Sequence, residues 1–163
     1  MPEPSDDLAR CAVAIAAALA AADSGERAAA RRMDEGGAPV FWRQVARLKL
    51  PRWQEAGWLR FTRMVAILTP ASARQTVHDS NQSLGAVLAA AGVSEHRLAR
   101  LLAARGAARD AALERAIRMV ASAGPKLNVV DLARLVFGCD RNRLARTYYE
   151  RLDHAPSEKS EDA

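Results

Sequence analysis

The chain has 163 residues, half of them apolar, which is enough to bury the core of one domain or of two small lobes. Alanine supplies much of the apolar fraction, only 5% of the residues are aromatic, and no run alternates valine or isoleucine with polar residues. This composition argues against a β-sheet core and predicts an all-α fold.

The formal net charge is +5, but the acidic residues gather at the two ends. When residues 1–7 and 153–163 are left out, 23 Lys and Arg face 12 Asp and Glu, a net charge of +11 for residues 8–152. Nearly all of these basic residues are arginine, whose planar guanidinium binds phosphates in pairs of hydrogen bonds and stacks on bases. The charge therefore predicts a polyanionic partner such as nucleic acid.

Helical patterns fill the first part of the chain. The first helix is expected to begin at Ser5 and to end near Asp23. Its alanine-rich stretch follows two aspartates rather than a basic segment and is too short to span a bilayer, so it predicts a buried helix of a cytoplasmic protein without a membrane partner. Three more helices follow in "ERAAARRM", "APVFWRQVARLKLP" and "WQEAGWLRFTRMVAIL". Residues 5–70 form a predicted N-terminal lobe.

Residues 71–82 are polar and lack periodicity, which predicts an exposed loop between two lobes. Residues 83–152 hold further helical patterns and form a predicted C-terminal lobe, in which Asn128 and Asp140 are expected N-caps. The polar, acidic residues 153–163 predict a disordered tail. Together these patterns predict a compact bundle of about eight to nine helices in two lobes.

Catalytic and metal-binding constellations are missing from the sequence. Ser83, His78 and Asp79 are close in sequence, but no nucleophile-elbow glycines surround the serine. The two cysteines, Cys11 and Cys139, are far apart and without nearby ligands, so we expect two reduced thiols and no metal site. We predict a protein that is not an enzyme and uses no cofactor.

The three tryptophans have two interpretations. Aromatic side chains among arginines can stack on unpaired bases. However, Trp53 falls on the apolar face of its predicted helix, and Trp42 and Trp58 neighbour apolar positions. We therefore expect core packing for all three. Of the adjacent Tyr148 and Tyr149, only one can face inward.

The stretch "SLGAVLAAAGVSEHRLARLLAAR", residues 83–105, predicts two short helices joined at a glycine. Ser83 and Ser94 are expected N-caps of the two helices. The second helix buries three leucines, and its other side carries His96, Arg97 and Arg100, which face solvent or a ligand. The pair resembles a helix-turn-helix, so a regulator that binds double-stranded DNA through Ser83–Arg105 is one hypothesis. Against it, Leu88 stands where such motifs usually have a small residue, and the other arginines are spread along the whole body.

The same stretch also resembles the SLGxxLAxxG-x-SExRLxxLL signature of the CasB family, the small subunit of the type I-E Cascade CRISPR surveillance complex. Further matches occur in order: "RR" at Arg31–Arg32, "APVFWRQV", "TRMVAIL", an arginine-bearing helix before Gly124–Pro125, and "CDRNRLARTYY". The resemblance covers about residues 8–152. Where the family commonly has a basic residue, this chain has His96.

The resemblance implies a non-catalytic, all-helical subunit that stabilises the R-loop. Its partners would be other Cascade subunits, a second copy of itself, the crRNA, and the target and non-target DNA strands. Distributed arginines suit such backbone contacts, which need no base-reading geometry. We predict a nucleic-acid-binding set, part of it matched to the family motifs and part placed by the helix pattern, that consists of Arg32, Arg52, Arg74, Arg97, Arg100, Arg115, Arg118 and Arg143.

Two alternatives remain open at this stage. One is the helix-turn-helix regulator described above. The other is a helical adaptor that binds proteins and whose arginines only solvate the surface.

Overall fold

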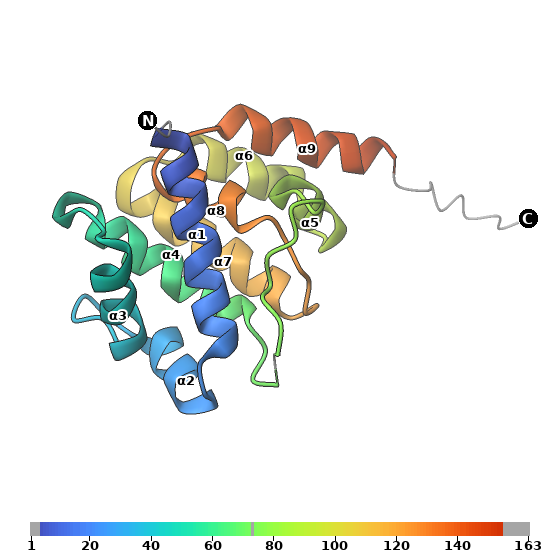
Figure 1. Ribbon diagram of the computed structural model, residues 1–163. Coiled ribbons are helices and arrows are strands. Elements are labelled where there is room, and N and C mark those ends of the chain that lie inside the picture. Colours follow the sequence, from blue (N-terminus) through green and yellow to red (C-terminus); the bar gives the residue numbers. More distant parts are fainter. Residues whose placement is uncertain (1–3, 73, 155–163) are drawn as a thin grey trace, which may run out of the picture.

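The computed structural model describes residues 4–72 and 74–154, which fold into nine α-helices and one 3-10 turn (Figure 1). This confirms the predicted all-α fold. Within these residues, extended backbone pairs only at one isolated bridge, between His78 and Leu127. The elements in chain order are α1 (Pro4–Ala21), α2 (Ser24–Arg32), α3 (Pro39–Leu48), η1 (Arg52–Gln54), α4 (Glu55–Leu68), α5 (Leu84–Ala90), α6 (Glu95–Ala103), α7 (Gly106–Ala121), α8 (Val129–Val136) and α9 (Arg141–Asp153).

Two of the predicted N-caps are confirmed. The Ser94 hydroxyl accepts a hydrogen bond from the Arg97 backbone N–H at 3.2 Å, at the start of α6. The Asn128 side chain accepts one from the Val130 N–H at 3.0 Å, at the start of α8. Each bond satisfies one of the N–H groups that have no partner within the helix.

The predicted caps Ser83 and Asp140 occupy the cap positions, but their side chains make no capping bond. The first N–H of α5, that of Leu84, is instead satisfied by the carboxylate of Asp131 in α8, at 3.1 Å. This bond spans 47 residues, and local sequence patterns carry no signal for it.

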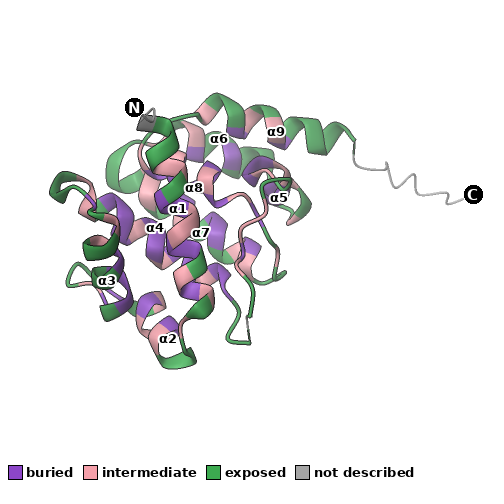
Figure 2. Ribbon diagram, in the orientation of Figure 1, coloured by how far each residue is buried: buried purple, intermediate pink, exposed green. Residues whose placement is uncertain are grey.

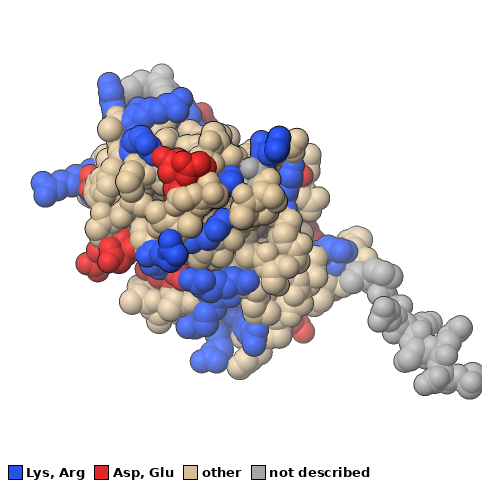
Figure 3. Space-filling view, turned by 90° about the horizontal axis from the view of Figure 1, so that it is seen from below, with Lys and Arg blue, Asp and Glu red and all other residues tan. Residues whose placement is uncertain are grey.

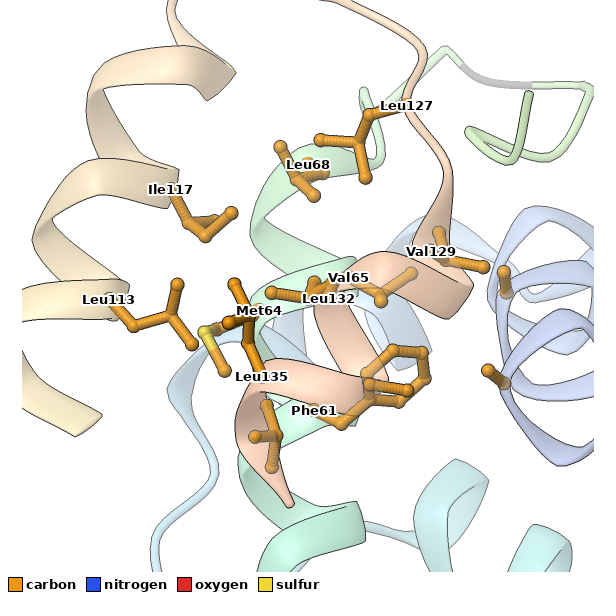
Figure 4. Packing of buried hydrophobic residues seen from close by; sticks show 14 of the residues in the cluster. Phe61, Met64, Val65, Leu68, Leu113, Ile117, Leu127, Val129, Leu132 and Leu135 are labelled. Carbon is orange, nitrogen blue, oxygen red and sulfur yellow. The ribbon is translucent and has the colours of Figure 1, made fainter. Parts of the chain in front are cut away.

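Helix α4 lies at the centre of the fold. It contacts α1, α2, α3, α7 and α8. Most of its residues are buried, and Phe61, Met64, Val65 and Leu68 extend into the cluster of apolar side chains drawn in Figure 4. Figure 2 shows the same arrangement, with buried residues on α4 and on the facing sides of α1, α7 and α8.

The segment between residues 71 and 82 forms no helix, as predicted, but it is not wholly exposed. Val77 is buried, its carbonyl accepts a hydrogen bond from the Leu127 N–H, and the Leu127 carbonyl accepts one from the Asp79 N–H, both at 2.9 Å. The expectation of an exposed loop is therefore wrong for this part, because an apolar side chain and a short pairing with residue 127 hold it against the core. The apolar cluster includes residues from both sides of the segment, and the division into two lobes stays a prediction.

Three further expectations concern the ends and the surface. The predicted tail lies outside the described residues except for Asp153, the last residue of α9, and His154. Cys11 is buried and Cys139 is exposed, and both are free thiols. Among the described residues, no helix has the length and apolar character needed to cross a bilayer, and no group of potential ligands could hold a metal ion.

Helices α5 and α9 make the most intimate contact in the fold, at Gly85. A Cβ atom added there would overlap the Thr147 hydroxyl and would lie 2.4 Å from the carbonyl oxygen of Leu144 and 2.6 Å from the backbone nitrogen of Tyr148. Two of these three neighbours are backbone atoms, which cannot move aside without shifting α9. Glycine in the "SLG" sequence therefore allows the two helix backbones to touch.

We predict that Gly85→Ala destabilises the protein by about 2–3 kcal/mol, because overpacking a backbone contact forces the two helices apart. Chemical denaturation followed by circular dichroism measures the change. The matched control is Gly36→Ala in an exposed turn, where the added Cβ would meet only the flexible Asp34 carboxylate at 3.2 Å. We expect a change below about 0.5 kcal/mol for the control. Equal effects of the two substitutions would contradict the close approach.

Candidate nucleic-acid interface

A groove of about 470 Å³ runs between α6 and α7. The two helices pack on each other and are joined by only two residues, 104 and 105. The residues that line the groove come from both helices and from the turn before α6: Val93, Arg97, Arg100, Leu101, Ala112, Arg115, Ala116, Arg118 and Met119. Four of the eight arginines predicted from the sequence are among them.

Helical periodicity explains why these four arginines converge. In α6, Leu98 and Leu101 are buried against the core, and the arginines at 97 and 100 stand three residues apart on the adjoining exposed side. In α7, Leu113, Ile117 and Val120 are buried, and the arginines at 115 and 118 have the same spacing. The other residues that line the groove have small or apolar side chains.

The charge of the groove is only partly neutralised within the described residues. The side chains of Arg100 and Arg115 are exposed and make no hydrogen bond or ion pair with the described part of the chain. Arg97 contacts the sulfur of Met119, which carries no charge. No acidic side chain lines the groove. Such a surface attracts anions, and phosphate in particular suits the guanidinium fork.

Arg118 differs from the other three because it is tied to Glu114, one turn earlier in α7. Its Nη2 donates to the Glu114 carboxylate at 2.8 Å, and the same carboxylate accepts from Arg63 of α4 at 2.5 Å. Partial burial of Glu114 acts to raise its pKa, but the hydrogen bonds and charges of Arg118 and Arg63 outweigh it, so the pKa lies below its ordinary value. The carboxylate thus joins α4 to α7 and holds one arginine at the rim of the groove.

We predict that Glu114→Gln lowers the melting temperature at neutral pH and that the difference from the parent shrinks in acid. A carboxyl group whose pKa is depressed by folding contributes stability above its unfolded-state pKa, and that contribution is lost as the pH falls through the folded-state pKa. Thermal melts of both proteins between about pH 7 and pH 3 test this, since the ordinary pKa of Glu is about 4.3. A constant difference over the whole range would show that the ion pairs do not act as described.

Three other predicted arginines are exposed but lie outside the groove. Arg32 ends α2, Arg52 begins η1, and Arg74 lies in the segment before α5. None of them has an ion pair with a described residue. They remain predicted contacts, distributed over surfaces other than the groove.

Arg143 has a structural partner. Its Nε donates to the Asp131 carboxylate at 3.0 Å, and the other oxygen of that carboxylate accepts from the first N–H of α5. Asp131 is buried, so Arg143 neutralises a charge inside the packing of α5, α8 and α9. Its role as a nucleic-acid contact stays a prediction.

A family model described as CRISPR-associated protein Cse2 matches residues 26–149, about three quarters of the chain. The chain belongs to the Cse2 family. This family, also called CasB, is the small subunit of the type I-E Cascade complex. No curated protein and no solved structure matched the chain.

The family match spans α2 to α9 almost completely and so includes both sides of the groove. It confirms the resemblance drawn from the "SLGAVLAAAGVSEHRL" stretch and its companions. Cse2 is a structural subunit of Cascade, and the chain is therefore a component of a CRISPR surveillance complex.

Basic side chains also gather on a larger scale. Figure 3 shows the face seen from below Figure 1, where Lys and Arg cover more surface than Asp and Glu and lie in several groups, the largest of them near the lower centre of the view. The two arginines of the "RR" pair in this Cse2 chain, Arg31 and Arg32, have different surroundings. Arg31 donates to the carbonyl oxygens of Ala66 and Thr69 at the end of α4, at 3.0 and 2.8 Å, whereas Arg32 is exposed.

The tryptophans correct a sequence-based prediction. Trp58 is buried, as expected, but Trp42 is 42% exposed and Trp53 is 81% exposed. Core packing is wrong for Trp53, because the chain forms the separate turn η1 after Pro51 and α4 begins only at Glu55. The helical periodicity that placed Trp53 on the apolar face of α4 does not extend to it. Of the two tyrosines only one is buried, as expected: Tyr148 is buried and Tyr149 is exposed.

Sequence reasoning missed two contributors to the groove. Met119 lines it and contacts Arg97, and Glu114 holds Arg118. The spacing of Glu114 and Arg118, four residues apart in a predicted helix, was the available signal for the second of these. Nothing in the sequence indicated that Arg63, 51 residues away, would share the carboxylate.

Proposed function

We propose that this Cse2-family chain is a non-catalytic Cascade subunit whose α6–α7 groove binds the sugar-phosphate backbone of a nucleic-acid strand and so stabilises the R-loop. Its partners are other Cascade subunits, a second copy of the chain, the crRNA and the two DNA strands. One observation carries the proposal: four arginines predicted separately from sequence line a single groove without an acidic side chain.

The energetics of R-loop formation make such contacts effective. The guide–target duplex is about as stable as the DNA duplex that it replaces, so a few contacts to the backbone decide whether the R-loop persists. Each arginine that contacts a phosphate also releases counterions from the strand, which favours binding at low salt. Neither effect requires recognition of the base sequence.

Two observations favour this proposal over the duplex-binding regulator. First, the arginine face of α6 forms one wall of a groove with α7, whereas a recognition helix enters the major groove with its face free. Second, α5 packs chiefly on α9. In a helix-turn-helix, the first helix supports the second by crossing it closely.

We predict that the double reversal Arg100→Glu and Arg115→Glu weakens binding of single-stranded DNA by at least about tenfold and leaves the helical fold intact. Both side chains lack ion pairs within the described residues, so their replacement breaks no internal contact. The slope of log affinity against log salt should fall by about 1.4, since each contact to a single strand contributes about 0.7. Fluorescence anisotropy of the full-length chain over a salt series measures both quantities.

The matched control reverses Arg146 and Arg151 in α9, which are also exposed and without ion pairs in the described part of the chain. The change in net charge is the same, so a larger effect of the groove substitutions isolates position from charge. Equal losses of affinity in the two variants would show that binding depends on net charge alone and not on the position of the arginines. Unchanged binding by the groove variant would contradict the proposal, and binding confined to duplex DNA would favour the regulator.

A further inference from the structure

Trp53 is the most exposed large apolar side chain in the described part of the chain, at 81%. It lies in η1, the turn between α3 and α4, and does not line the α6–α7 groove. A tryptophan contributes little to folding when it is left in water, and large exposed apolar groups mark binding sites.

The backbone that carries Trp53 is held on both sides. Before it, Leu50 is buried, and Pro51 fixes its own backbone angle and accepts a hydrogen bond from the Gln54 N–H at 2.9 Å. After it, the Gln54 side chain accepts a bond from the indole of Trp58 at 3.1 Å, and Trp58 is buried. The exposed ring therefore projects from an ordered turn, and a ligand that stacks on it need not order the backbone.

The charge on the N-terminal side of this turn has one sign, and Glu55 follows the turn as the first residue of α4. No acidic residue occurs between residues 36 and 54. Arg47, Lys49 and Arg52 are exposed, and none has an ion pair with a described residue. Arg43 is different, because it is paired with Glu26 of α2. Trp53 thus follows directly on a stretch of the chain that carries three exposed cations without ion pairs in the described residues.

We propose that Trp53 is a stacking platform for an unpaired nucleobase, and that Arg52 and Lys49 contact the phosphates beside that base. This inference rests on the proposed strand-binding function, but it uses different elements from the α6–α7 groove. A flat aromatic ring flanked by cations is the arrangement with which proteins bind single strands without sequence preference. A protein partner would be expected to bury Trp53 within a larger apolar surface, which its own turn does not offer.

The experiment compares two probes of equal charge: an oligothymidylate of about 16 nucleotides and an abasic oligonucleotide of the same length. Binding of each to the full-length chain is measured by anisotropy. Stacking is worth about 1–3 kcal/mol per base, so Trp53→Ala should weaken oligothymidylate binding by about 5- to 150-fold. Binding of the abasic probe and the salt dependence should not change, and Trp53→Phe should recover part of the loss.

The matched control is Leu152→Ala, another exposed apolar side chain on α9, which should affect neither probe. The groove reversal should weaken both probes and flatten the salt dependence, so the two proposals fail in different ways. Loss with the groove variant alone would overturn the stacking role, and loss with Trp53→Ala alone would overturn the groove. A Trp53→Ala variant that binds oligothymidylate normally but no longer assembles with other Cascade subunits would show that Trp53 is a protein contact instead.

Two further results would also count against the proposal. Equal affinity of the parent chain for the two probes would overturn the stacking role. Binding of neither probe, even at low salt, would overturn both proposals.

Discussion

The packing of α7 against α4 determines which side of α7 remains free, and the groove depends on it. Leu113, Ile117 and Val120 are buried on the side that faces the core. Two ion pairs fix the register: Arg60 with Asp110 at 3.2 Å and Arg63 with Glu114 at 2.5 Å. Because this side of α7 is buried, the arginines at 115 and 118 lie on its exposed side. Helix α6 likewise buries Leu98 and Leu101 and leaves its arginines exposed. Because α6 packs on α7, the arginine pairs of the two helices line the same groove.

Arginine has two separate roles in this fold. One group donates hydrogen bonds to carbonyl oxygens at the C-terminal ends of helices, where the helix dipole is negative. Arg31 does so for α4, Arg105 for α6 and Arg109 for α8. A second group, which includes Arg100 and Arg115, has no partner within the described residues. The arginines of the first group are part of the basic excess and have a structural role. Those of the second group form the positive surface that we propose binds nucleic acid.

Much of the fold could be predicted from the sequence because its signals are local. Helical periodicity, Pro39 at a helix start and the caps at Ser94 and Asn128 are all determined within a few residues. The features that were wrong or missed depend on distant residues. Asp131 caps α5 across 47 residues, and Val77 is held by Leu127. No local pattern contains these contacts.

The candidate site shows the same division. Spacing predicted that Arg97 and Arg100 would share a side of their helix, and the family resemblance supplied Arg115 and Arg118, but only the packing of α6 on α7 brings the two pairs together. The prediction that Trp53 is buried was wrong because a three-residue turn, Arg52–Gln54, separates Pro51 from the start of α4 and interrupts the helical pattern. As a result, the Trp53 side chain is exposed and available to a ligand.

The central claim is that the α6–α7 groove keeps the R-loop open. The most direct test is the lifetime of a single R-loop in a reconstituted type I-E Cascade that carries either the parent chain or its Arg100→Glu, Arg115→Glu variant, after a check that both assemble equally. The account predicts a shorter lifetime with the variant, most clearly at low salt, and a shallower dependence of that lifetime on salt concentration. An equal lifetime at every salt concentration would contradict it.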